Sequence, residues 1–250
     1  MISDSEIVRF LNDYLRVEEI KDYGTNGIQV DAPPPLDKIG FTVDCRIDVV
    51  TKAVQDGMDM LVCHHGLIWG GLNRIKGSSY DIIHMLMDND TALYQAHLPL
   101  DIHPEVGNNV SLAELIDAEV TGSFYEDMGE DIAVIAELNE EKYVRELGSL
   151  LSKRLDTDIV TLQKNVKVSR IGIMTGKGGD ALLEAKEKDV DMFLTGEREH
   201  SVYTKAINNN IPLILAGHYA TETLGVKALM NKIQKEYDIR CKFISSETPL

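Results

Sequence analysis

Short apolar runs alternate with amphipathic segments along most of the chain, and this alternation is the strongest constraint on its fold. Runs typical of strands lie at 38–43, 58–63, 92–96, 118–124, 131–138, 168–174, 191–195, 212–216 and 240–244. Apolar residues recur at helical spacing in the opening segment and at 46–56, 79–89, 108–117, 140–154, 180–188, 199–208 and 221–236. Because each parallel crossover needs a covering helix, the pattern predicts an α/β protein with helices on both faces of its sheets.

The sequence also contains an internal echo. A gapless shift places Ile39-Gly40 on Ile171-Gly172, and the apolar pattern around both pairs agrees. Such self-similarity favours a duplicated α/β unit over chance recurrence of an alternating pattern. No low-complexity linker interrupts the 250 residues, which suffice for two small domains. We therefore expect two similar halves, residues 1–125 and 126–250.

Composition limits the partners and the compartment. The chain has 25 Lys and Arg against 41 Asp and Glu, a net charge of −16 that disfavours nucleic acid and anionic lipid as partners. Its three cysteines are unclustered, which argues against a disulfide framework and for a reducing cytoplasm. The acidic, amphipathic start and the absence of an apolar run of about 18 residues predict a protein that is neither exported nor inserted into a membrane.

Four predicted strands end in polar residues that can bind metal, and this convergence is the main functional signal. These residues are His64-His65, His97 to Asp101, Gly196-Glu197 and His218 to Glu222. The carboxyl ends of parallel strands are where ligands bind in α/β sheets, because the loops diverge there. A second internal match superimposes the His97 and Asp101 pair on the His218 and Glu222 pair.

The residue types indicate which ions would fit. Imidazoles with carboxylates suit Zn, Mn, Fe or Ni better than Mg or Ca. Three histidines and two carboxylates are too many for one catalytic ion and too few to saturate two, which fits a dinuclear centre with ions about 3.5–4 Å apart. The alternative is that these are solvated or hydrogen-bonded histidines at loop starts. His200, three residues beyond Glu197, is a candidate for acid–base work or substrate contact, with a plain surface position as the alternative.

Several spaced motifs resemble one known family, the NIF-three-like proteins, also called the GTP cyclohydrolase I type 2 family of dinuclear-metal proteins. The resemblance runs nearly end to end. It rests on Asn26-Gly-Ile-Gln29, His64-His65-Gly-Leu, His97-Leu-Pro-Leu-Asp101 with Gly107-Asn-Asn109, Thr195-Gly-Glu197-x-x-His200 and Gly217-His218-Tyr-Ala-Thr-Glu222. The family commonly has proline where this chain has Gly66, a departure that should alter loop stiffness rather than coordination.

The resemblance implies two intertwined three-layer α/β/α halves facing a dimetal cleft, assembled as a toroidal hexamer. Carried over by position, His65 and Asp101 hold one divalent ion, His64 and His218 hold the other, and Glu222 bridges both. His97 then resembles a residue behind the ligands or facing the substrate, although its match to His218 leaves direct ligation open.

The family name implies that the guanine imidazole ring of GTP is opened. Metal hydroxide would attack C8 and formate would leave, with His97 or His200 as the acid that protonates the leaving nitrogen. Two alternatives stay open: a metal-dependent phosphoester hydrolase, and a ring-shaped, metal-stabilised protein that binds nucleic acid or a regulatory protein. A basic strip for nucleic acid would come from residues such as Lys164, Lys167 and Arg170.

Overall fold

The computed structural model describes residues 4–33, 36–71 and 74–248 and consists of two compact units. The first unit comprises Met1–Leu100 and Val226–Ser246, and the second comprises Asp101–Gly225 and Glu247–Leu250. The chain crosses between them three times: inside α4 (Leu98–Asp101), inside α9 (His218–Tyr237) and after Ser246. Within the described ranges, no helix combines the length and apolar character that a membrane crossing requires.

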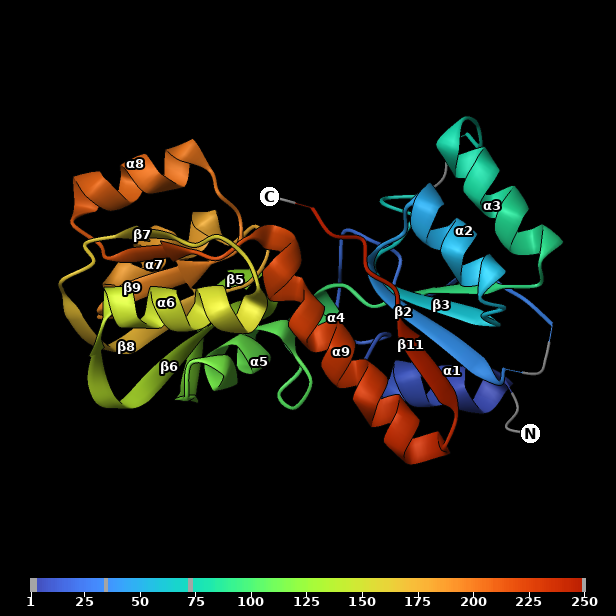
Figure 1. The fold of residues 1–250 in the computed structure, drawn as a ribbon, viewed down its shortest axis with the longest axis horizontal. Helices are drawn as coiled ribbons and strands as arrows, with labels where there is room; N and C mark the ends of the chain where they lie inside the picture. Colours follow the sequence, from blue (N-terminus) through green and yellow to red (C-terminus); the bar gives the residue numbers. More distant parts are fainter. Residues whose placement is uncertain (1–3, 34–35, 72–73, 249–250) are drawn as a thin grey trace. The chain divides into compact units, whose positions relative to one another are not determined.

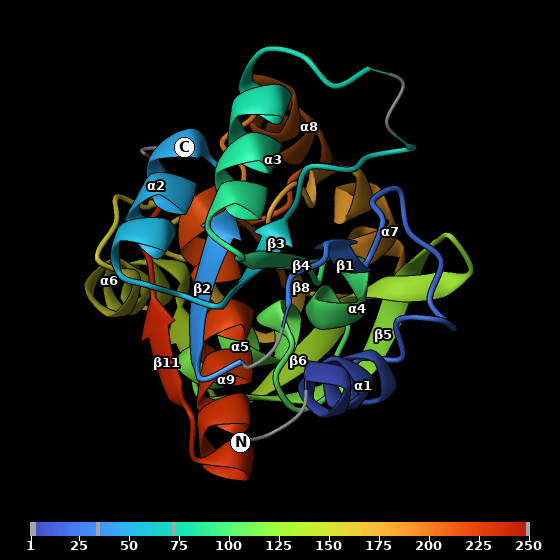
Figure 2. The ribbon, with the colours of Figure 1, turned by 90° about the vertical axis from the view of Figure 1, so that its right-hand side faces the viewer.

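The first unit is built on a sheet with the order β1-β4-β3-β2-β11. Its strands are β1 (Gly27–Val30), β2 (Lys38–Asp44), β3 (Met60–His65), β4 (Ala92–Gln95) and β11 (Arg240–Phe243). All neighbours are parallel except β1, which pairs antiparallel with β4 at the sheet edge. Helices α2 (Ile47–Gln55) and α3 (Ser78–Asp88) cover one face, and α1 (Asp4–Tyr14) with the C-terminal part of α9 covers the other (Figures 1 and 2).

The second unit is built on a sheet with the order β5-β6-β8-β9-β10-β7. Its strands are β5 (Ala118–Asp127), β6 (Glu130–Tyr143), β7 (Val160–Leu162), β8 (Lys167–Met174), β9 (Met192–Thr195) and β10 (Leu213–Leu215). Its helices are α5 (Asn108–Leu115), α6 (Val144–Leu155), α7 (Leu182–Glu187) and α8 (His200–Asn209), and the short 3-10 helix η1 (Gly179–Ala181) precedes α7. Strands β8, β9 and β10 are parallel, whereas β5, β6 and β7 run antiparallel to their neighbours.

Alternating side chains of the second sheet pack into two separate cores. Met192 and Leu194 of β9 belong to the core beneath α5 and α6, whereas Phe193 between them belongs to the core beneath α7 and α8. Successive strand residues point to opposite faces, so a sheet covered on both sides needs apolar residues at every position. The continuous apolar runs read from the sequence are therefore explained by a three-layer α/β/α arrangement.

The internal echo in the sequence corresponds to a strand order and a hydrogen-bond pattern that occur in both sheets. Strands β2, β3, β4 and antiparallel β1 follow one another across the first sheet as β8, β9, β10 and antiparallel β7 do across the second. Asp59 accepts hydrogen bonds of 2.8 Å from the backbone N–H groups of Asp37 and Lys38, where β2 begins, and Asp191 accepts the equivalent two bonds from Ser169 and Arg170 of β8. The predicted α/β class with a duplicated layout is confirmed.

The antiparallel elements are the main departure from the predicted pattern. Strands β1 and β7 and helix α4 were not expected, and β6 continues to Tyr143 where a helix from residue 140 was expected. Met128 and Gly129, with φ of 54° and 94°, form the left-handed turn that joins β5 to β6. Such a turn links antiparallel strands directly, without a crossover helix.

Candidate metal centre

Three histidines of the first unit meet where two parallel neighbours, β3 and β4, end. His64 and His65 are the last residues of β3, and His97 follows β4. Each offers a ligand atom, and these atoms lie within 4.8 Å of one another. His64 is fully buried, whereas His65 and His97 are partly exposed. The strand ends thus bring together side chains that are far apart in the sequence, as the pattern predicted.

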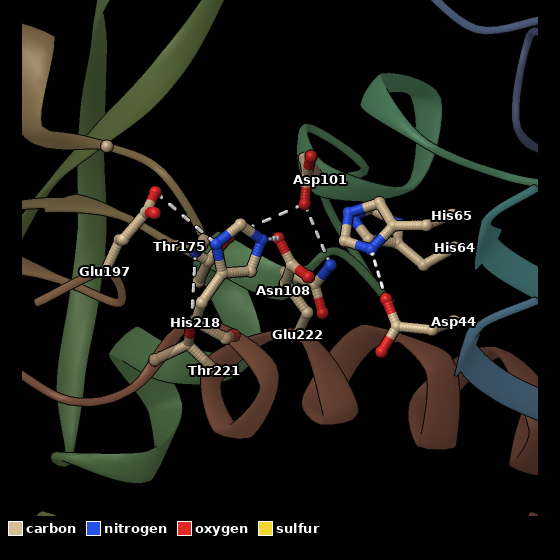
Figure 3. Close-up of polar contacts among 12 residues, drawn as sticks. Asp44, His64, His65, Asp101, Asn108, Thr175, Glu197, His218, Thr221 and Glu222 are labelled. Atoms are coloured by element: carbon tan, nitrogen blue, oxygen red, sulfur yellow. Dashed lines mark hydrogen bonds and ion pairs between the residues drawn. The ribbon is translucent and has the colours of Figure 1, made fainter. Parts of the chain in front are cut away.

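The Nδ1 atom of each of these three rings lies within hydrogen-bonding distance of an oxygen atom. His64 Nδ1 lies 2.8 Å from the carbonyl oxygen of Ala96, which can only accept, so Nδ1 carries the hydrogen and Nε2 presents its lone pair. His65 Nδ1 lies 2.8 Å from Oδ1 of Asp44, the residue opposite it in the β2–β3 register (Figure 3). Metal-binding histidines are typically oriented by just such an acceptor on their other nitrogen.

His97 has the most extensive support of the three. Its Nδ1 lies 2.8 Å from Oδ1 of Asp22, whose side chain is only 2% exposed. Asp22 also accepts from the Asn26 amide at 2.7 Å and from the Leu98 N–H at 2.9 Å. Burial acts to raise the pKa of the Asp22 carboxyl, but the bond and charge of His97, with the bonds from Asn26 and Leu98, lower that pKa below its usual value. An ionised Asp22 therefore fixes the His97 ring.

A glutamine clamps the loop after the two adjacent histidines. Gln29 Oε1 accepts from the N–H groups of Leu67 at 2.7 Å and Ile68 at 3.2 Å, and its Nε2 donates to Gln95 Oε1 at 2.9 Å. The Gly66 N–H also donates to Gln95 Oε1, at 2.9 Å, a bond that a proline at this position lacks the hydrogen to make. The Asn26 to Gln29 motif therefore positions the histidine loops rather than supplying ligands.

In the second unit, the carboxylates of Glu197 and Glu222 lie beside His218. His218 and Glu222 lie one turn apart at the start of α9, and His218 Nε2 is 3.0 Å from Glu222 Oε1 (Figure 3). Glu197, which follows β9, places Oε2 3.6 Å from His218 Nδ1. The Gly176 N–H donates to Thr221 Oγ1 at 3.1 Å, which ties the loop after β8 to the same helix turn.

Two neighbouring asparagines hold Asp101 and the loop after β8, one each. Asn108 Nδ2 donates to Asp101 Oδ1 at 2.8 Å, and its own Oδ1 accepts from the Gly225 N–H at 2.7 Å. Asn109 Oδ1 accepts from the Thr175 N–H at 2.9 Å. Both asparagines are buried, so they join α4, α5, β8 and α9 through polar bonds inside the unit. These hydrogen bonds are the structural role of the Gly107-Asn-Asn109 motif.

The predicted site residues are distributed over the two units. The first unit brings together His64, His65 and His97, and the second contains Asp101, Glu197, His218 and Glu222. His200 is exposed as the first residue of α8. Sequence reasoning missed the supporting carboxylates Asp22 and Asp44. Asp44 could have been found as an acidic residue ending the strand beside β3, whereas Asp22 lies in an irregular segment with no spacing signal.

The donor chemistry fits a divalent transition metal. Imidazole nitrogens oriented by oxygen acceptors, with carboxylates nearby in the sequence motifs, are typical ligands of Zn, Mn, Fe or Ni. Cys63, the residue of β3 that precedes the two histidines, is buried in the core instead, and its Sγ donates to the Tyr94 carbonyl oxygen at 3.4 Å. Burial raises the pKa of the Cys63 thiol well above its usual value, which disfavours the thiolate that a metal would bind.

Fold and side chains together define a duplicated α/β protein with histidine and carboxylate groups able to bind metal ions. The chain belongs to the Duf34/NIF3 (NGG1p interacting factor 3) family, whose sequence model matches residues 2–249. A Pyrococcus abyssi protein named GTP cyclohydrolase 1 type 2 homolog is 40% identical over 98% of both chains. A protein of the same name from Deinococcus radiodurans is 34% identical over 100% of this chain and 95% of its own.

Solved structures agree with this assignment. Protein ybgI, described as of unknown function, has a TM-score of 0.93 at 31% identity, with both chains covered completely. The protein TTHA1606 from Thermus thermophilus has a TM-score of 0.88 at 31% identity, also over 100% of both chains. The recognition of the family from its spaced motifs is confirmed.

Proposed function

We propose that this protein is a dinuclear metal-dependent hydrolase that opens the guanine ring of GTP, as the name of its Pyrococcus and Deinococcus relatives suggests for those proteins. The observation that carries the proposal is the orientation of the three clustered histidines. Each has Nδ1 held by an oxygen acceptor, which aims Nε2 of the ring away from the supporting structure. A merely solvated histidine does not need such support.

The proposed ligand assignment draws on both units. His65 and Asp101 would hold one ion, His64 and His218 the other, and Glu222 would bridge them. All five residues lie in the spaced motifs that carry the family resemblance. Two such ions would supply an activated water and neutralise negative charge that develops during the reaction.

The chain's own residues then position the substrate and move a proton. Ring opening needs a proton at the leaving nitrogen of the imidazole ring, and we assign its delivery to Nε2 of His97. The Asp22 carboxylate beside Nδ1 fixes the His97 ring, which leaves Nε2 as the atom that can pass a proton to the substrate. One water opens the ring to a formamide, and a second releases formate.

The His97→Gln variant is expected to retain bound metal and lose most activity. Removing a general acid costs about 10²–10⁴-fold in rate, whereas the buried His64 and the other proposed ligands are unchanged. Metal content per chain, measured by elemental analysis alongside the rate, separates the two roles. If metal content falls together with activity, His97 is a ligand and the proton-transfer assignment is wrong.

Formate release tests the proposed reaction itself. The protein is loaded separately with Zn, Mn, Fe or Ni, incubated with GTP, and assayed for formate with a coupled dehydrogenase. We expect formate in proportion to the GTP consumed with at least one metal, none with Glu222→Gln, and wild-type rates with His84→Ala. His84 is a suitable control because it is exposed on α3 and paired with Asp88.

No formate with any of these metals would contradict ring opening. Inorganic phosphate released from nucleotides or other phosphoesters under the same conditions would instead support a phosphoester hydrolase, in which the ions neutralise phosphoryl oxygens. Binding of nucleic acid with a steep salt dependence and no turnover would support the ring-shaped binding protein.

The proposal extends to assembly and compartment. We propose a homohexamer, as the family resemblance implies, that works in the cytoplasm. The thiols support a reducing compartment: Cys45, Cys63 and Cys241, the three cysteines of the sequence, are all free.

A further inference from the structure

We propose that Trp69 is the stacking surface for the planar heterocyclic ring of the substrate and thereby selects nucleobases. The inference deepens the proposed function and rests on it for the location of the reaction, beside the three histidines. Its own support comes from the position, the rigidity and the exposed face of this one side chain, all within the first unit.

The indole ring of Trp69 lies against the histidine cluster. Its centroid is 4.9 Å from that of His97 in an edge-to-face arrangement, and 6.1 Å from that of His65. Nevertheless, Trp69 is 41% exposed. A large aromatic surface is costly to leave in water, and exposed aromatic rings beside chemically competent groups are typical of binding sites. A ring bound on this surface would lie next to two of the proposed functional imidazoles.

The surroundings hold Trp69 rigidly despite its exposure. Its Nε1–H donates to the Gly66 carbonyl oxygen at 2.9 Å, and its backbone forms an antiparallel bridge with Gly24. On either side of it, Thr25 N–H donates to the Ile68 carbonyl and Gly70 N–H to the Tyr23 carbonyl, both at 3.0 Å. A side chain fixed in advance loses little conformational entropy when a ligand stacks on it.

These contacts also define the ligand chemistry. Because the only polar atom of the indole already donates to Gly66, the exposed part of Trp69 offers an apolar π surface and no hydrogen bond. Such a surface favours a flat heteroaromatic ring, which can stack across its whole face, and offers neither a hydrogen bond nor a charge to phosphate. Base stacking on an aromatic side chain of this kind contributes substantially to binding.

Trp69 is the single tryptophan of the chain, so it reports on its own occupancy. Tryptophan fluorescence, excited at a wavelength where the nucleobase absorbs little, is titrated with guanosine, with ribose 5-phosphate and with inorganic phosphate. We expect saturable quenching by guanosine, and none by the two probes that lack a base. Quenching that fails to saturate, or that ribose 5-phosphate reproduces, would overturn the proposal.

Variants test the contribution to affinity by calorimetry, which does not depend on fluorescence. Trp69→Ala should raise the Kd for guanosine about 5- to 100-fold, and Trp69→Phe, which keeps a stacking face, less than about 5-fold. Tyr80→Ala, which removes a ring of similar exposure on α3, should bind as the wild type does. Metal content should be the same in all three variants. Wild-type affinity in Trp69→Ala would overturn the stacking role.

These experiments distinguish a failure of the stacking proposal from a failure of the proposed hydrolysis. Saturable quenching without formate release supports the stacking surface and contradicts ring opening. Formate release from GTP, with guanosine affinity unchanged in Trp69→Ala, supports ring opening and overturns the role of Trp69.

Discussion

The His64→Ala variant is expected to lose bound metal and remain folded. His64 is fully buried, and its substitution removes the Nδ1–H bond to the Ala96 carbonyl oxygen. Losing a buried hydrogen bond costs about 1–3 kcal/mol, which a domain stabilised by roughly 5–15 kcal/mol can tolerate. The proposed metal centre, by contrast, would lose a nitrogen ligand that the Ala96 carbonyl orients in advance.

The Glu222→Ala variant, a substitution in the second unit, should likewise lose bound metal and remain folded. Its carboxylate is buried and lies 3.0 Å from His218 Nε2. Elemental analysis should show metal falling from about two ions per chain, the number a dinuclear centre requires, to one or none. Circular dichroism and thermal unfolding report the fold, and exposed His84→Ala is the matched control. Unchanged metal content in both His64→Ala and Glu222→Ala would show that the assignment is wrong.

The parallel core of each sheet was predictable because its signal is local. Strands β2, β3, β8 and β9 are apolar runs with amphipathic helices beside them, and both patterns are carried by neighbouring residues. Strand β1 has only four residues and is defined by pairing with β4, as Gly27 pairs with Gln95. Nothing in a segment that begins with a turn-like Asn-Gly indicates a partner so distant in sequence.

The same distinction separates the predicted and the missed parts of the site. His64, His65 and His97 could be found because they end or follow strands, and strand ends are readable from a pattern. The acceptors that orient them could not, because Asp44 lies 21 positions from His65 and Asp22 lies 75 positions from His97. Sequence spacing therefore indicated which histidines lie at the strand ends, while the orientation of their rings depends on the tertiary fold.

Gly176→Ala is expected to remove metal although residue 176 has no ligand atom. Gly176 has φ of 56°, and a Cβ added to it would fall on Oε1 of Glu222 and lie 3.3 Å from Nε2 of His218. The carboxylate must give way because the clash involves the end of a side chain and the glycine is held by its N–H bond to Thr221. Left-handed strain adds about 1–2 kcal/mol, so the fold should survive while the His218–Glu222 pair is broken.

The Gly57→Ala variant distinguishes the effect of backbone strain from the effect of displacing the Glu222 carboxylate. Gly57 has φ of 64°, and an added Cβ there would meet only the end of Lys38, at an ordinary 3.5 Å. Both variants should therefore unfold at similarly lowered temperatures, but only Gly176→Ala should lose metal. If Gly57→Ala loses as much metal as Gly176→Ala does, backbone strain alone is responsible for the loss. If Gly176→Ala keeps its full metal content, the Glu222 carboxylate is not needed where the structure places it, and a bridging role for Glu222 is excluded.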